Sequence, residues 1–125
     1  MSALEEAKAH MAKAREFLEA AHLSHDLELY SAATSNAVIA GINAKDALCL
    51  KLTGRTGKTE NHQEALAELR ASGAKGRDLE PTLARLLKLK AKSQYQSAPV
   101  AATDAAKAVD WAGRMVDGAI EVVTG

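Results

Sequence analysis

Two residues with the chemistry of a metal-independent ribonuclease lie close together in the sequence, Arg55 and His62, with six residues between them. An imidazole can transfer the proton of a ribose 2′-hydroxyl near neutral pH, and a guanidinium can stabilise the charge that develops on the phosphate. The alternative is that both residues belong to an exposed polar connector between two helices. Spacing does not decide between these hypotheses, because a glycine-containing loop of this length spans anything from contact to about 20 Å.

Further basic residues provide candidate phosphate contacts. Lys58 lies in the same connector, close to the first turn of the next helix, whose unpaired amides favour an anion. Arg85, Lys88 and Lys92 recur at three- and four-residue steps, so on a helix they form one basic ridge that can follow a phosphate backbone. A solvated face opposite a leucine stripe explains the same three residues equally well.

Three polar residues interrupt the most apolar part of the chain: Asn36, Asn43 and Asp46. Their spacing places them on one side of a helix, where they must form hydrogen bonds or reach water. One hypothesis is that they support a polar pocket beside Arg55 and His62. The other is that they form hydrogen bonds between helices or across a dimer interface.

Composition argues against several other kinds of site. The single Cys49 rules out an internal disulfide and a multi-cysteine zinc site, and we interpret it as a small core residue. His22, His25 and Asp26 lack a distant fourth ligand, so we expect a polar turn there, and neither a metal ion nor any cofactor. Aromatic residues make up only 3% of the chain, which argues against base stacking as the main binding mode. We interpret Tyr95 and Trp111 as packing anchors.

The charges balance at 16 basic and 16 acidic residues, so no global field directs the protein to nucleic acid or membrane. Basic residues do concentrate in the range 51–94, which predicts a locally basic end of the fold. We see neither a long apolar stretch nor a signal peptide, and therefore expect a cytoplasmic protein without membrane contact.

Apolar residues recur with helical period throughout, and no stretch alternates with period two. The length suits one domain, residues 1–125. The pattern predicts an all-α, antiparallel up-and-down bundle of four to five helices. The second helix is rich in alanine, so neighbours can approach it closely and we expect it at the centre. The expected helices are Ser2 to Ala21, Leu27 to Leu52, a short third capped by Asn61, a fourth from Asp78 to Gln94 with Pro81 in its first turn, and a fifth opened by Thr103.

Three segments resemble the HEPN family of small helical proteins. They are the alanine-rich SAATSNAVIAGINAKDALCLKLTG, the connector and short helix GKTENHQEALAEL, and the tail KSQYQSAPVAATDAAKAVDWAGRMVDGAIEVV. Together they cover most of residues 17–123 in the family order. The resemblance implies a bundle that commonly forms a homodimer and pairs with a nucleotidyltransferase-like protein in a toxin–antitoxin system. In one subset it implies RNA cleavage by an Arg and a His that four to six residues separate.

The resemblance therefore leads to three functional hypotheses. The first is an interaction module that partners a nucleotidyltransferase-like protein and contacts nucleotide or nucleic acid. The second is a metal-independent endoribonuclease that uses Arg55 and His62. The third is a nucleotide-binding module whose positively charged connector, with Arg55 and Lys58, holds the phosphate.

Overall fold

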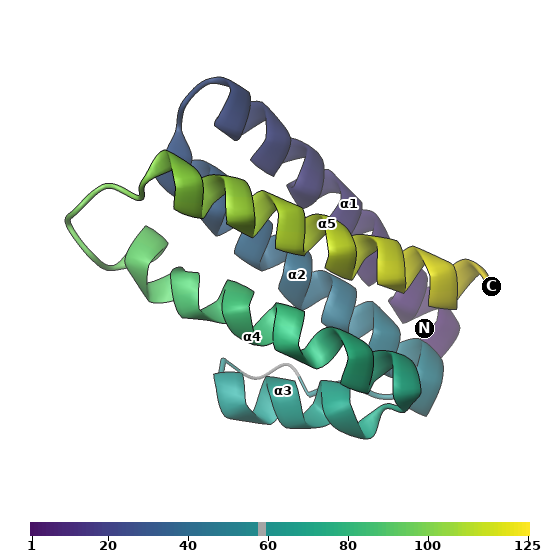
Figure 1. The fold of residues 1–125 in the computed structure, drawn as a ribbon. Coiled ribbons are helices and arrows are strands. Elements are labelled where there is room, and N and C mark those ends of the chain that lie inside the picture. Colours follow the sequence, from purple (N-terminus) through teal and green to yellow (C-terminus); the bar gives the residue numbers. More distant parts are fainter. Residues whose placement is uncertain (58–59) are drawn as a thin grey trace.

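A computed structural model describes residues 1–57 and 60–125, and these form helices with no strand. The predicted all-α bundle is confirmed (Figure 1). Four of the helices are long and pack lengthwise, and the short third helix lies along the fourth. Their bounds are α1 Ala3–Asp26, α2 Tyr30–Thr53, α3 His62–Ala71, α4 Ala74–Gln94 and α5 Ala102–Thr124.

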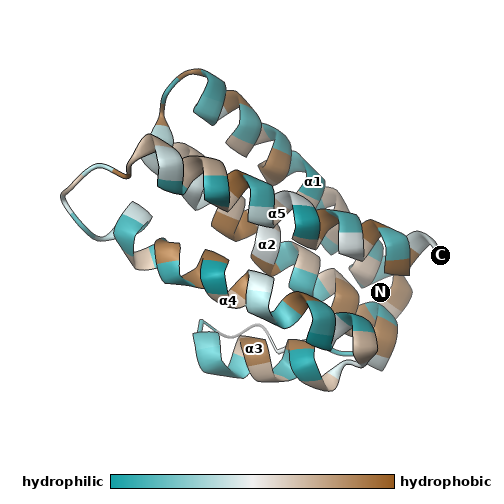
Figure 2. Ribbon diagram, viewed as in Figure 1, coloured by the Kyte–Doolittle hydropathy of each residue, from teal (hydrophilic) through white to brown (hydrophobic). Residues whose placement is uncertain are grey.

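The helix α2 is the centre of the bundle, as its small residues predict. It contacts all four other helices, and every residue from Ala40 to Leu50 except Ile42 is buried. At Gly41 a Cβ atom would clash with the side chain of Leu86, so the glycine lets α4 approach closely. Around this rod, α1 and α5 mix hydrophilic and hydrophobic residues along their length, as amphipathic helices do (Figure 2).

The turn between α1 and α2 is shorter than predicted. The helix α1 continues through the HLSHD segment to Asp26, and α2 begins at Tyr30 without a side-chain cap. Within this last turn of α1, the hydroxyl of Ser24 donates to the carbonyl of Ala20. The chain reverses through Glu28, whose φ of 61° lies in the left-handed region.

The start of α4 is also corrected. Asn61 caps α3 as predicted, accepting from the amides of Gln63 and Glu64. The next helix, however, begins at Ala74, so Pro81 lies inside it and not in its first turn. In the SGAKG segment, Ser72 and Gly73 form the turn between α3 and α4, and the last three residues are already helical. Buried Gly76 packs directly on the backbone of Leu69, which a residue with a Cβ could not do.

The two predicted aromatic anchors differ. Trp111 packs against the core, whereas Tyr95 is 75% exposed, so its assignment as an anchor is wrong. Tyr95 follows α4 directly and belongs to the connector to α5, which leaves its ring outside the bundle. None of the helices in the described part of the chain is long and apolar enough to cross a membrane.

Candidate functional site

A cavity of about 300 Å³ lies between α2, α3 and α4, and we call it the α2–α3–α4 cavity. Its apolar wall includes Ile42, Leu83 and Leu87, while His62 and Lys90 add polar groups from α3 and α4. Both polar residues are half-buried. Asp46 and Glu60 also line it, so the cavity combines an apolar wall with an imidazole, an ammonium group and two carboxylates. Small-molecule sites commonly pair an apolar wall with a few polar groups in this way.

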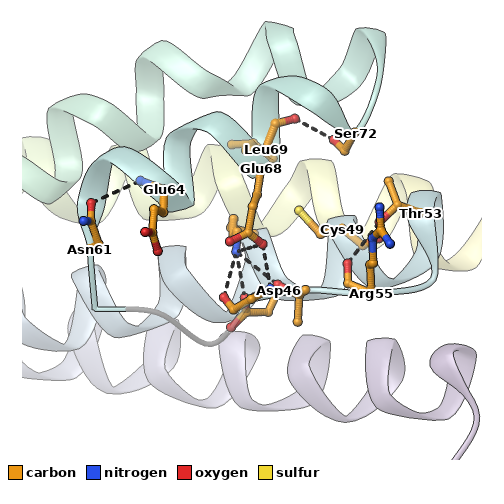
Figure 3. Close-up of polar contacts among 12 residues, drawn as sticks. Asp46, Cys49, Thr53, Arg55, Asn61, Glu64, Glu68, Leu69 and Ser72 are labelled. Carbon is orange, nitrogen blue, oxygen red and sulfur yellow. Dashed lines mark hydrogen bonds and ion pairs between the residues drawn. The ribbon is translucent and has the colours of Figure 1, made fainter.

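The deepest charge beside this cavity is Lys45, only 2% exposed. Its ammonium group donates to Asp46 Oδ1 and Glu68 Oε2, both at 3.2 Å, and to Thr56 Oγ1 at 3.0 Å. The Thr56 hydroxyl in turn donates to Asp46 at 2.7 Å, and the amide of Gly57 donates to Glu68 at 2.6 Å. We call these five residues the Lys45 network; Figure 3 shows it joining α2, the connector and α3. Because two carboxylates already neutralise it, Lys45 has no charge to spare for a phosphate.

The predicted supporting residues divide into two groups. Asn43 and Asp46 both face His10 of α1, whose Nδ1 lies 2.9 Å from Asn43 Oδ1 and 4.0 Å from Asp46 Oδ2. Since Asn43 Nδ2 donates to the carbonyl of Ile39, its oxygen is left to accept from a protonated Nδ1. Asn36 lies apart, donating to Ser24 at 3.3 Å. These contacts tie helices together, and of the three residues only Asp46 lines the cavity.

Arg55 and His62 do not meet within one chain. Arg55 is exposed and lines a separate cavity with Cys49 and with Ala71, the last residue of α3, whereas His62 is the first residue of that helix. Ten helical residues span about 14 Å along the axis. In Figure 3, Arg55 correspondingly lies at the opposite end of α3 from Asn61, the residue directly before His62.

The structure does not bring the predicted phosphate-binding residues together into one site. Lys58 lies outside the described residues. Arg85 and Lys88 are exposed on α4. Lys92 forms an ion pair with Asp104 at 2.7 Å, and this contact lowers the pKa of Asp104 below its ordinary value of 3.8. The basic ridge is thus a solvent-facing surface whose third member is already paired.

Cys49 behaves as the core residue that the sequence predicts. It is 2% exposed, and burial raises the pKa of its thiol to about 11. A protonated thiol is a poor nucleophile, so Cys49 does not supply a covalent catalyst at neutral pH. Among the described residues, no group of three or more His, Cys, Asp or Glu side chains is placed to hold a metal ion.

The comparison with protein families fits this architecture. The model of the HEPN domain matches residues 7–122, nearly the whole chain. The chain belongs to the HEPN family. A search of curated proteins found no match.

Sequence reasoning missed several polar residues of this HEPN domain. The sequence does contain a sign of Lys45, because Lys45 and Asp46 lie inside the apolar run GINAKDALCL, and charged groups that are buried must be paired. Nothing in the sequence points to His10 or Glu68, because their partners, Asn43 and Lys45, lie 33 and 23 residues away from them in the chain. Lys90 lies on a helix with several other lysines, and only the packing of α4 selects it to line the cavity.

Proposed function

We propose that this HEPN domain is an interaction module of the cytoplasm, which forms a homodimer and pairs with a nucleotidyltransferase-like protein. In that pair it contacts nucleotide or nucleic acid. The HEPN match over residues 7–122 is the observation that carries the proposal, because the resemblance associates such domains with these partners. The separation of Arg55 from His62 within the chain supports a binding role over a self-contained catalytic one.

Co-expression with a nucleotidyltransferase-like protein tests the partnership. We expect the two chains to co-purify at a fixed ratio, and the domain alone to give the mass of a dimer in light scattering. A domain that stays monomeric and forms no complex would contradict the proposal. Leu48→Asp, which disrupts the core, serves as the unfolded control for nonspecific association.

The second candidate is a metal-independent endoribonuclease, and the position of His62 at a cavity favours it. Since the chain separates His62 from Arg55, catalysis would join Arg55 of one protomer to His62 of its partner. Purified protein should then cleave RNA in the presence of a chelator, and His62→Ala should abolish cleavage. No cleavage by the wild-type protein at high concentration would remove this candidate.

Mixing two inactive variants tests the shared site directly. If Arg55→Ala and His62→Ala protomers exchange freely, half of the dimers are mixed and each mixed dimer contains one intact site. About a quarter of the wild-type activity should return. A site built within one chain would recover nothing on mixing.

A third candidate is nucleotide binding in the α2–α3–α4 cavity, where His62 and Lys90 flank an apolar wall. A mononucleotide titration by calorimetry should then saturate. Lys90→Ala should weaken the binding and the exposed Arg85→Ala should leave it unchanged, because Arg85 does not line the cavity. The connector hypothesis makes a different prediction, namely that Arg55→Ala or Lys58→Ala weakens the binding.

A further inference from the structure

Three leucines gather at the turn that joins α1 to α2. Leu23, Leu27 and Leu29 are 57%, 69% and 54% exposed, and we call them the leucine turn. Leu27 follows Leu23 by one helical turn, with its amide bonded to the carbonyl of Leu23, so the two side chains share a face. The amide of Leu29 donates to the carbonyl of Ser24, which holds the backbone of the third leucine in the same turn. Single exposed leucines are ordinary, but three within seven residues form a patch.

The charges along this segment are of one sign. No lysine or arginine occurs between Arg15 and Lys45, whereas four carboxylates do: Glu16, Glu19, Asp26 and Glu28. All four side chains are exposed.

The neighbouring helix α5 adds little positive charge to offset these carboxylates. Its Asp110 lines a cavity with His22 and His25 of α1 and is paired with Arg114, and its one remaining cation near that end is the exposed Lys107. Arg15 also lines a cavity with Leu23, Glu16 and Glu19, so the patch is apolar with a mainly acidic border.

We propose that the leucine turn is a docking surface for a partner protein that presents an apolar depression bordered by lysine or arginine. Charge complementarity selects this occupant, because a basic border neutralises Asp26 and Glu28 while the leucines leave water. A second copy of this chain, related by a twofold axis, would bring two borders of the same negative sign together. Anionic lipid surfaces and nucleic-acid phosphates carry the same sign as the border and are repelled. The inference concerns this surface alone and does not depend on which function is correct.

A peptide titration followed by NMR tests the surface without knowledge of the natural partner. The probe is a synthetic amphipathic helix with leucines on one face and lysines along both borders, and its matched control carries glutamates in place of the lysines. With isotope-labelled full-length protein, we expect saturable amide shifts confined to residues 22–30 with the basic peptide only. Added salt should weaken the binding, as it screens exposed charges.

Matched variants distinguish binding at the leucine turn from nonspecific binding of the peptide to exposed apolar residues. Leu27→Ser with Leu29→Ser should lower the affinity at least about tenfold, or about 1.4 kcal/mol. Leu52→Ser, a change at another exposed leucine (42% exposed) at the other end of α2, should not. Asp26→Asn with Glu28→Asn should remove most of the salt dependence. Circular dichroism confirms that each variant is folded.

Three results would overturn the proposal. The first is the absence of saturable shifts at residues 22–30 up to roughly 1 mM basic peptide, a concentration equivalent to about −4 kcal/mol of binding. The second is equal weakening by Leu52→Ser. The third is a wild-type dimer that becomes monomeric in the Leu27→Ser, Leu29→Ser variant without any peptide, since the turn would then be the surface between two copies of this chain.

Discussion

Replacing Lys45 by methionine should destabilise the fold more than any substitution of an exposed lysine. The two side chains have similar length, so the change mainly removes the charge and its hydrogen bonds. Lys45 is 2% exposed and its two carboxylate partners lie at 3.2 Å. Without the ammonium group, Asp46 keeps a negative charge in a site that is 7% exposed.

The expected loss follows from how well each partner is buried. Removing one member of a buried ion pair costs about 3–5 kcal/mol, because the other charge remains without compensation. Glu68 has a side chain that is 31% exposed, so water screens part of its charge, and we expect a value near the lower limit, about 3 kcal/mol. That is a large fraction of the total stability of an ordinary domain.

Urea unfolding measures the effect. With a typical slope, a loss of about 3 kcal/mol lowers the midpoint by roughly 1 to 3 M at an unchanged slope. Adding Asp46→Asn to the variant should restore at least about 1 kcal/mol, since the uncompensated charge is then gone. Exposed Lys88→Met is the control and should stay within about 0.5 kcal/mol of wild type. A loss below about 1 kcal/mol for Lys45→Met would refute the reasoning.

Three further changes test other parts of the fold. Because burial raises the pKa of Cys49 to about 11, only the unfolded thiol ionises between pH 9 and 11, so stability to urea should fall by up to about 3 kcal/mol across that range, and Cys49→Ala should remove this slope. Gly76→Ala should cost more than about 2 kcal/mol, because its Cβ meets the carbonyl of Leu69, whereas Gly113→Ala, with open space, should gain about 0.5–1 kcal/mol in thermal unfolding. Glu28→Gly should raise the melting temperature, with a gain of about 1 kcal/mol, since glycine adopts a φ of 61° without strain; an unchanged or lower melting temperature would contradict this.

The fold could be predicted from local sequence patterns, because apolar and small residues recur with helical period along its helices. The run of small residues in α2 predicts the close approach of its neighbours, which Gly41 and Leu86 display. The residues at which helices begin and end could be predicted less well. The SGAKG segment has the composition of a loop, and the sequence does not show that α4 already begins at Ala74, where the packing of Gly76 on Leu69 favours helix.

The candidate site could be predicted only in part. Residue type and spacing identified His62 and Asp46, both of which line the α2–α3–α4 cavity. They could not reveal that Arg55 faces a different cavity, because the direction of a connector depends on where its backbone is anchored. That anchor is Lys45, whose partners come from elements far apart in the sequence.

The Lys45 network also constrains how Arg55 could ever reach His62. Thr56 and Gly57 follow Arg55 directly, and hydrogen bonds of 2.7 and 2.6 Å hold them to Asp46 and Glu68. Carrying Arg55 along α3 would break these bonds and expose Lys45, so the ground state keeps the two residues apart. If RNA cleavage required such a movement, Glu68→Gln would increase the cleavage rate, because it weakens the hydrogen bonds that hold the connector. If cleavage instead joined two protomers, the same variant would leave the rate unchanged or lower it, because the anchored connector is what presents Arg55 to the partner.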